Sequence, residues 1–338
     1  MNPFEQINHD PELIPGAWNA INVCLKVQSH EKVTLIVDEA CREIGAALSE
    51  QLVQAGAPVT HWYLEHCVRR PLERMPEAIL TDLESSQVSI YAVVPQANEL
   101  KSRMQITEVV NRRQIRHAHM VNITPQIMKE GMRADYNEVD DLSVRLLAIT
   151  RRCRQVRATT PAGTEIVASM NPDYRWLKTS GIISQNTWGN LPGGEVWTTP
   201  GEVNGTFVVD GVVGDYLCAK YGDLGETPLT LRVEDNRLRE AYCSNRELED
   251  EFWRYTHTDE NSDRVGEFAI GTNIGVRDVI GNILQDEKIP GVHIAFGNPY
   301  GDHTGANWFS STHIDVVGRR FDIWADDRQV MARGRFLV

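Results

Sequence analysis

Near the N-terminus the sequence alternates between strand-like and helix-like segments. Residues 32–38, "KVTLIVD", have the continuous apolar character of a buried strand, whereas residues 40–56 place apolar side chains at helical spacing and end at Gly56. Residues 57–65, "APVTHWYLE", return to strand-like character. A strand, a helix and a strand in this order form a βαβ unit, whose parallel sheet must be covered by helices. The alternation therefore predicts the α/β fold class, with a parallel sheet in the N-terminal part of the chain.

The character of the sequence changes near residue 157. A long amphipathic helix is expected at residues 139–156, and beyond it short apolar or alternating runs are separated by Gly, Pro and Asn. Such runs are typical of antiparallel β-structure, and one helix is expected among them at residues 245–257. We therefore predict an α/β domain at residues 1–157 and a β-rich domain at residues 158–338.

The charge of the chain excludes some classes of partner. Its formal net charge is −13, whereas binding to phosphate backbones or anionic lipid needs concentrated Lys and Arg. We interpret the one basic cluster, "RRCRQVR" at residues 151–157, as a solvated strand or helix end. No apolar run reaches the length of about 20 residues that a membrane helix needs, and the N-terminus lacks the pattern of an export signal. We expect no nucleic-acid partner and no membrane contact.

The cysteines bear on the cellular compartment. All six lack CxxC spacing, and the chain is large enough to fold without disulfides. We therefore expect reduced thiols and a cytoplasmic protein. A glycine-rich phosphate loop after the first strand is absent, so the α/β pattern does not by itself predict a nucleotide.

Two histidines and an aspartate near the C-terminus have the spacing of metal ligands. In "THID", His313 and Asp315 would share one face of a strand, about 6–7 Å apart. In "VHIAFGNPY", His293 stands on a predicted strand, and Tyr300 follows seven residues later, after a Gly-Asn-Pro turn that can fold the chain back. Taken singly, a charge-paired histidine on a strand or an aromatic side chain under a turn is the simpler explanation of each feature.

Two glutamates make a metal site a better explanation than separate structural roles. Glu195 and Glu267 each follow a glycine at the head of an apolar strand, with no Lys or Arg beside them. A buried carboxylate there is costly unless a cation or hydrogen bonds satisfy it, although a solvated strand end is the ordinary alternative. Two Glu, two His, one Asp and one Tyr are too many donors for one tetrahedral ion and suit two ions that share carboxylates. Such paired ions hold a hydroxide and polarise a carbonyl, which is the chemistry of amide hydrolysis.

Four sequence blocks carry a family resemblance. The blocks "LPGGEVWTTPGEVNGTFVVDG", "GEFAIGTN", "GNILQDEKIPGVHIAFGNPY" and "SSTHIDVV" resemble, in order and spacing, the motifs of the M29 family of metallo-aminopeptidases, the aminopeptidase T or thermophilic aminopeptidase group. The resemblance covers most of residues 158–330. It implies a leucyl aminopeptidase-like hydrolase whose β-rich domain binds two divalent metal ions, Zn, Co or Mn. The implied ligands are Glu195, Glu267, His293, Tyr300, His313 and Asp315.

The hydrolase interpretation leads to hypotheses about the roles of individual residues. A metal-activated hydroxide would attack an N-terminal peptide bond or small amide, Glu267 would relay a proton to the leaving amine, and Tyr300, where it is not bound to metal, would donate to the oxyanion. The family's enzymes are commonly dimers, so a homodimer is expected. Candidates for contact with a small-molecule or peptide substrate are His303, Asn307 and Arg320, and candidate pocket-lining tryptophans are Trp188, Trp197, Trp308 and Trp324.

Two other interpretations compete with the hydrolase. The same fold family includes mononuclear non-haem Fe(II) dioxygenases of the 2,5-dihydroxypyridine dioxygenase type, which carry a histidine at the position of Glu267. Two histidines and one carboxylate form the facial triad of ferrous oxygenases. The presence of Glu267, His293 and Tyr300 favours two ions over one iron. A metal-binding scaffold without activity is the third interpretation.

Overall fold

The chain divides into two compact units. A computed structural model describes residues 2–185 and 189–338. Unit 1 consists of Met1–Asn137 and Gly181–Gly193, and unit 2 consists of Glu138–Ser180 and Gly194–Val338.

These units do not coincide with a division at residue 157. Helix α7 (Tyr136–Thr150) contributes Leu146 and Leu147 to the hydrophobic core of unit 2, so that most of it belongs with the β-rich part. The segment Gly181–Gly193 carries strand β8 (Gly189–Asn190), which pairs with the sheet of unit 1. Both departures depend on which core a segment packs against, which its local pattern does not reveal.

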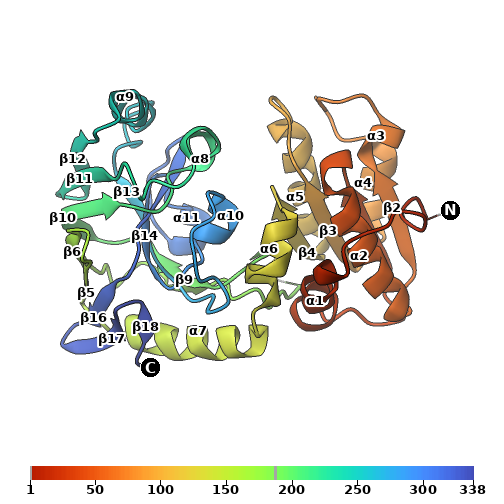
Figure 1. Cartoon of the computed structure of the whole chain (residues 1–338), viewed down its shortest axis with the longest axis horizontal. Coiled ribbons are helices and arrows are strands. Elements are labelled where there is room, and N and C mark those ends of the chain that lie inside the picture. Colours follow the sequence, from red (N-terminus) through yellow and green to blue (C-terminus); the bar gives the residue numbers. More distant parts are fainter. Residues whose placement is uncertain (1, 186–188) are drawn as a thin grey trace. The chain divides into compact units, whose positions relative to one another are not determined.

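Unit 1 is built on a five-stranded parallel sheet with the strand order β2-β1-β3-β4-β8. Strands β1 and β3 are buried along their whole length, which explains their continuous apolar sequence. Figure 1 shows the helices of this unit beside its sheet, in red to yellow. The predicted parallel-sheet α/β region is thus confirmed. Its remaining elements are α1 (Ile14–Trp18), β1 (Val33–Val37), α2 (Arg42–Gln54), β2 (Val59–Tyr63), α3 (Leu64–Cys67), α4 (Glu77–Glu84), β3 (Val88–Val93), α5 (Leu100–Arg113), β4 (Arg116–Val121) and α6 (Pro125–Lys129).

A buried arginine lies at the carboxyl edge of this sheet, where α/β folds often bind ligands. Arg70 Nη1 lies 2.7 Å from Asp38 Oδ2, directly after β1, and its guanidinium also pairs with Glu99. Nη2 donates to the carbonyl of Val94, directly after β3. The guanidinium therefore binds the ends of two neighbouring strands, and this edge is held together by the chain's own charges.

Unit 2 is β-rich, as predicted, and contains two antiparallel sheets. The larger has the order β12-β11-β10-β6-β5-β16-β17-β18, and the smaller has the order β15-β14-β13-β9-β7. Its strands are β5 (Gln155–Thr159), β6 (Glu165–Ser169), β7 (Leu177–Lys178), β9 (Glu195–Thr198), β10 (Glu202–Val209), β11 (Leu229–Glu234), β12 (Arg237–Tyr242), β13 (Val265–Gly271), β14 (Gly291–Gly297), β15 (His313–Val317), β16 (Asp322–Ala325), β17 (Arg328–Ala332) and β18 (Arg335–Phe336). Its short helices are α8 (Asp215–Tyr221), α9 (Arg246–Tyr255), α10 (Ile283–Asp286) and α11 (Gly301–Thr304).

The two sheets of unit 2 share one hydrophobic core. Phe207 and Ile323 from the larger sheet belong to the same buried cluster as Phe268, Ile294 and Ile314 from the smaller one. Because side chains alternate along a strand, the intervening residues of β13, β14 and β15 point to the opposite face of the smaller sheet. That opposite face carries the predicted metal ligands.

Two observations bear on the environment of the protein. The six cysteines are free thiols. Among the helices in residues 2–185 and 189–338, none combines the length and the apolar character that crossing a membrane requires.

Candidate metal centre

The pairing register brings the predicted ligands onto one face of the smaller sheet. Glu267 and Asp315 both pair with Ala295, from the two sides of β14, so that they lie in one row across three strands. His293 lies two residues from Ala295 and therefore shares its face. A register shift between Val265 and Glu267 interrupts the ladder at this point, as β-bulges commonly do beside functional sites.

Small residues lie beside the ligands and leave room on this face. Glu195 pairs with Gly271, and His313 pairs with Gly297. His293 pairs with Ala269, and Ala295 separates the two carboxylates of the row described above. Because alanine projects little from the sheet, the longer ligand side chains can bend toward one another above Ala269 and Ala295, whereas the backbone of Ile289 and Thr312 lies close to Gly271 and Gly297.

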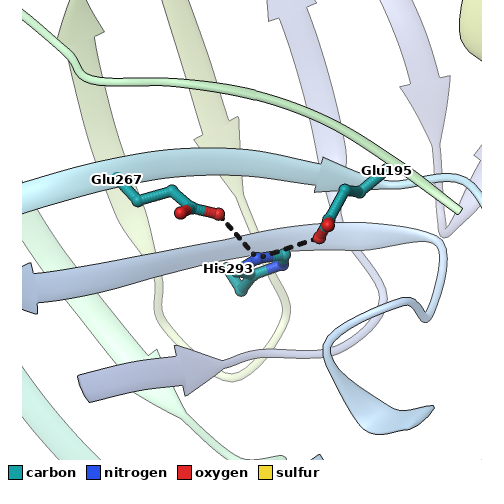
Figure 2. Close-up of side chains that lie close together, drawn as sticks. All are labelled: Glu195, Glu267 and His293. Atoms are coloured by element: carbon teal, nitrogen blue, oxygen red, sulfur yellow. Dashed lines mark ion pairs between the residues drawn. The ribbon is translucent and has the colours of Figure 1, made fainter. Parts of the chain in front are cut away.

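The ligand atoms are in contact with one another. One oxygen of Glu195, one of Glu267 and one ring nitrogen of His293 all lie within 4.8 Å of each other (Figure 2). His293 Nε2 is 3.6 Å from Glu195 Oε2 and 3.4 Å from Glu267 Oε1. His313 Nε2 is 3.7 Å from Glu267 Oε2 and 3.5 Å from Asp315 Oδ1. The contacts form a continuous series from Glu195 to Asp315, with Glu267 between the two imidazoles.

Tyr300 reaches the same cluster from a turn. Its ring centroid lies 4.6 Å from that of His313, and Trp197 of β9 contacts it edge-on at 6.0 Å. The backbone of Tyr300 has the left-handed φ of 48°, and its N–H donates to the Asn298 side chain. A tyrosine in this strained conformation at the start of α11 needs surrounding contacts to hold it. The structure thus brings all six predicted ligands into one cluster.

The negative charges of this cluster favour a bound cation. Burial would lower the pKa of His293, but Glu267 and Glu195 raise it above its usual value. Burial likewise acts against the charge on His313, yet the oxygens of Tyr300 and Asp315 raise its pKa well above the usual value. Although burial opposes it, the positive charge of His313 lowers the pKa of Asp315 to about 2. The carboxylates therefore attract protons onto the imidazoles, and divalent ions would supply the same positive charge.

Both oxygens of the Glu195 carboxylate have close partners. Glu195 Oε1 accepts a hydrogen bond of 2.6 Å from the Thr179 hydroxyl, and Oε2 forms an ion pair with Lys288. The neighbours of Oε2 are His293 Nε2 and, at 2.8 Å, Lys288 Nζ. Mixed carboxylate, imidazole and phenol donors of this kind fit Zn, Co or Mn.

The three predicted substrate residues lie outside the ligand cluster. His303 is on the exposed face of α11, Asn307 is exposed on the following loop, and Arg320 is exposed after β15. Arg320 lines a cavity of about 820 Å³ whose lining includes none of the six predicted ligands. Arg175 holds the turn of His303, because its side chain donates to the carbonyls of His303 and Asp302.

The predicted pocket tryptophans take different positions. Trp197 contacts Tyr300, and the Arg264 guanidinium lies over the ring of Trp308, 3.5 Å from its centroid. Trp324 lies in the larger sheet under Arg157, away from the ligand face. Trp188 falls outside the described residues. Only Trp197 is thus shown in contact with a predicted ligand.

The family model of thermophilic metalloproteases, M29, matches residues 136–320, which is more than half of the chain. The chain belongs to this family. Its expected class, a metal-dependent aminopeptidase-like hydrolase, is thereby confirmed. No curated protein matches the chain by sequence.

Two solved structures share the fold of this M29 protein. Wild-type AmpT from Thermus thermophilus is 18% identical with a TM-score of 0.70, and the alignment covers 97% of this chain and 99% of that one. The 2,5-dihydroxypyridine dioxygenase from Pseudomonas putida KT2440 is 15% identical with a TM-score of 0.68, covering 96% and 97%. At these identities both likenesses show the fold alone, and together they confirm the predicted fold class.

Sequence reasoning missed three residues of the M29 centre. Lys288 and Glu287 pair with each other at 2.5 Å, and Lys288 also pairs with Glu195. Thr179, directly after β7, binds the same glutamate twice: its hydroxyl donates to the Glu195 carboxylate, and its N–H donates to the Glu195 carbonyl. In the sequence, "DEK" has the character of a solvated charge cluster. No local signal distinguishes such a cluster from a buried ion pair beside the predicted ligands. By contrast, the small residues Ala295 and Gly297, at spacings of two and four from His293, were a visible signal for an open strand face.

Enlarging the small residue at the middle of the ligand face should impair metal binding. Ala295→Leu fills the space between Glu267 and Asp315, and overpacking costs about 1–3 kcal/mol. If that cost falls on the metal-bound state, affinity drops about 5- to 160-fold. Titration calorimetry with Zn²⁺ or Co²⁺ measures it. Ile294→Leu, on the opposite face, is the matched control and should bind as the unmodified protein does; unchanged affinity of Ala295→Leu would contradict the geometry.

Proposed function

We propose that this enzyme is an aminopeptidase that cleaves an N-terminal peptide bond or a small amide with two divalent ions. The observation that carries the proposal is the position of Glu267, whose two oxygens face different imidazoles, His293 and His313. A carboxylate in this position can serve two ions at once. Glu195 and His293 would hold one ion with it, and His313, Asp315 and Tyr300 would complete the other.

The chain's own residues would prepare the reaction around these ions. When bound, two divalent ions supply a hydroxide near neutral pH and polarise the substrate carbonyl. Although the charge of His313 lowers the pKa of Tyr300, burial and the nearby carboxylates outweigh it and raise the pKa above its usual value. Where Tyr300 is not bound to metal, a phenol that keeps its proton can donate a hydrogen bond to the developing oxyanion. Tyr300 is 41% exposed, so a substrate can reach it.

We further propose that Glu267, through an oxygen that is not bound to an ion at that stage, moves a proton from the attacking water to the leaving amine. It lies 6% exposed between the two imidazoles, among the residues that would hold the ions. A carboxylate in this position can accept a proton early in the reaction and return it later.

We propose that Arg320 binds a carboxylate of the substrate. The cavity that it lines also carries Arg145, Arg277, Arg319, Arg333 and Arg335, drawn from separate segments of unit 2. Guanidinium groups match carboxylates through paired hydrogen bonds, and this concentration of arginine contrasts with the net charge of −13. Asn307 and His303 are proposed as further substrate contacts on the exposed turn after Tyr300.

The remaining proposals concern assembly and compartment. We propose a homodimer, in line with the family resemblance; light scattering of the purified protein measures its mass. We propose a cytoplasmic location because the six cysteines are free thiols, which suits a reducing compartment. Cell fractionation tests the location.

Metal stoichiometry tests the central proposal. Purified protein loaded with Zn, Co or Mn should bind two ions per chain, and a chelator should abolish the hydrolysis of an amino-acid p-nitroanilide. Returning the metal should restore activity. One iron per chain together with oxygen uptake on a dihydroxypyridine would instead support a dioxygenase, and a chain that binds no metal would refute both.

Glu267→Gln separates the two proposed roles of this residue. We expect weaker binding of both ions, and in protein saturated with metal we expect kcat to be lower by about 10²- to 10⁴-fold, the usual contribution of general acid–base catalysis. Glu165→Gln, an exposed glutamate of β6, is the control. Full metal content with full hydrolysis in Glu267→Gln would remove the proton-transfer role.

Arg320→Ser should weaken binding of substrates that carry a free carboxylate. Because Arg320 is exposed, its contribution is expected near 1 kcal/mol, or about a fivefold rise in KM. The KM for the same peptide with an amidated C-terminus should not change. Arg232→Ser, an exposed arginine of β11, serves as control. Equal effects on both peptides would contradict the proposal.

A further inference from the structure

Lys288 places a buried positive charge beside the predicted metal ligands. Its side chain is 3% exposed, and its Nζ lies 2.8 Å from Glu195 Oε2 and 2.5 Å from Glu287 Oε1. A buried ammonium group persists only when nearby charges compensate for its lost hydration. The carboxylates of Glu195 and Glu287 supply that compensation at these two distances.

The backbone brings Lys288 to Glu195 through one close approach. Gly271 pairs directly with Glu195, and a Cβ added at Gly271 would lie 2.1 Å from the Ile289 carbonyl oxygen and 2.8 Å from the Lys288 carbonyl carbon. The Asn273 N–H donates to the Lys288 carbonyl at 3.0 Å, which fixes the segment in this place. The segment after α10 therefore crosses the strand end at the position opposite Glu195.

The carboxylate of Glu195 is consequently held at both oxygens by different groups. The Thr179 hydroxyl donates to Oε1 at 2.6 Å, and Lys288 pairs with Oε2. His293 Nε2 lies 3.6 Å from the same Oε2, on the side where the other ligands gather. Two contacts restrict the rotation of a carboxylate far more than one, because each fixes a separate oxygen.

We propose that Lys288 is a positioning residue that, together with Thr179, orients the Glu195 carboxylate for metal binding. The inference rests on the proposed metal site. Lys288 does not itself bind metal, since a charged ammonium group has no free lone pair. Groups that orient metal ligands commonly contribute 10- to 100-fold to metal affinity.

Glu287 completes the arrangement. It balances the charge of Lys288, so that the ammonium is shared between a ligand and a carboxylate that is not predicted to bind metal. The pair thus adds little net charge beside the ions, and Lys288 can hold Glu195 without strongly repelling them.

The test compares metal affinity in Lys288→Met, Lys288→Arg and the unmodified protein. Titration calorimetry measures the dissociation constants, and the visible spectrum of the Co²⁺-loaded protein reports ligand geometry. We expect Lys288→Met to lose about 10- to 100-fold in affinity for at least one ion and to shift the Co²⁺ spectrum. Lys288→Arg keeps the charge and should recover part of the loss. Thr179→Val should act in the same direction, and the two effects should not add, since both act through Glu195.

Lys220 provides a matched control. It also lies between two glutamates, 2.7 Å from Glu247 and 2.8 Å from Glu251, but on the surface formed by α8 and α9. Lys220→Met should leave both metal affinity and spectrum unchanged. If Lys288→Met alone does not fold, the double variant Glu287→Gln/Lys288→Met takes its place in the test, because it removes one charge of each sign.

The outcomes separate this inference from the proposed function. Two ions in the unmodified protein, with weaker binding and an altered spectrum in Lys288→Met, support the positioning role. Lower thermal stability with unchanged affinity and spectrum would assign Lys288 a structural role only, and tighter binding would show that it competes with the metal; either result overturns the inference while the two-metal site stands. No metal in the unmodified protein would refute the proposed function itself.

Discussion

Repulsion between carboxylates on one buried sheet face governs the construction of unit 2. Glu195 and Glu267 place oxygens within 4.8 Å of one another and of His293, and Asp315 and Glu287 lie in the same region. Two like charges at this distance repel by about 3–4 kcal/mol at an effective dielectric constant of about 20. Such a face is stable only where positive charge compensates, and the chain supplies it through His293, His313 and Lys288. Divalent ions are the natural replacement for the protons that the imidazoles otherwise hold.

The sheet meets this requirement with an asymmetric use of its two faces. On one face, Phe268, Ile294 and Ile314 join the core that the two sheets share. On the other, Ala269 and Ala295 leave the space in which the predicted ligands converge, and Gly271 and Gly297 lie beside Glu195 and His313. The apolar face anchors the strands, so the polar face can carry charges that would not support a fold by themselves. The same small residues allow the segment of Lys288 to pass close to Gly271.

Local pattern was sufficient for the strands and for the choice of the candidate ligands. The runs "EFAIG", "VHIAFG" and "THIDVV" each became a strand of the smaller sheet, and the predicted helix at residues 245–257 is α9. The sequence did not predict which unit α7 packs against, because its amphipathic pattern does not indicate which core contains Leu146 and Leu147. Lys288 could not be recognised either, since its burial depends on Gly271, Asn273 and Glu195, which are remote in sequence.

The sequence by itself determined the residue types and their alternation: apolar and polar side chains at a spacing of two, a His-x-Asp pair, a tyrosine after a turn, and two glutamates at strand heads. From these followed the fold class, the family resemblance and the six candidate ligands. Only the tertiary structure decided which residues meet. Register placed Glu267 and Asp315 on either side of Ala295, and a close backbone approach buried Lys288 against Glu195. The physical reason is that pairing register and burial depend on contacts between distant segments, whereas a sequence pattern reports only the preferences of neighbouring residues.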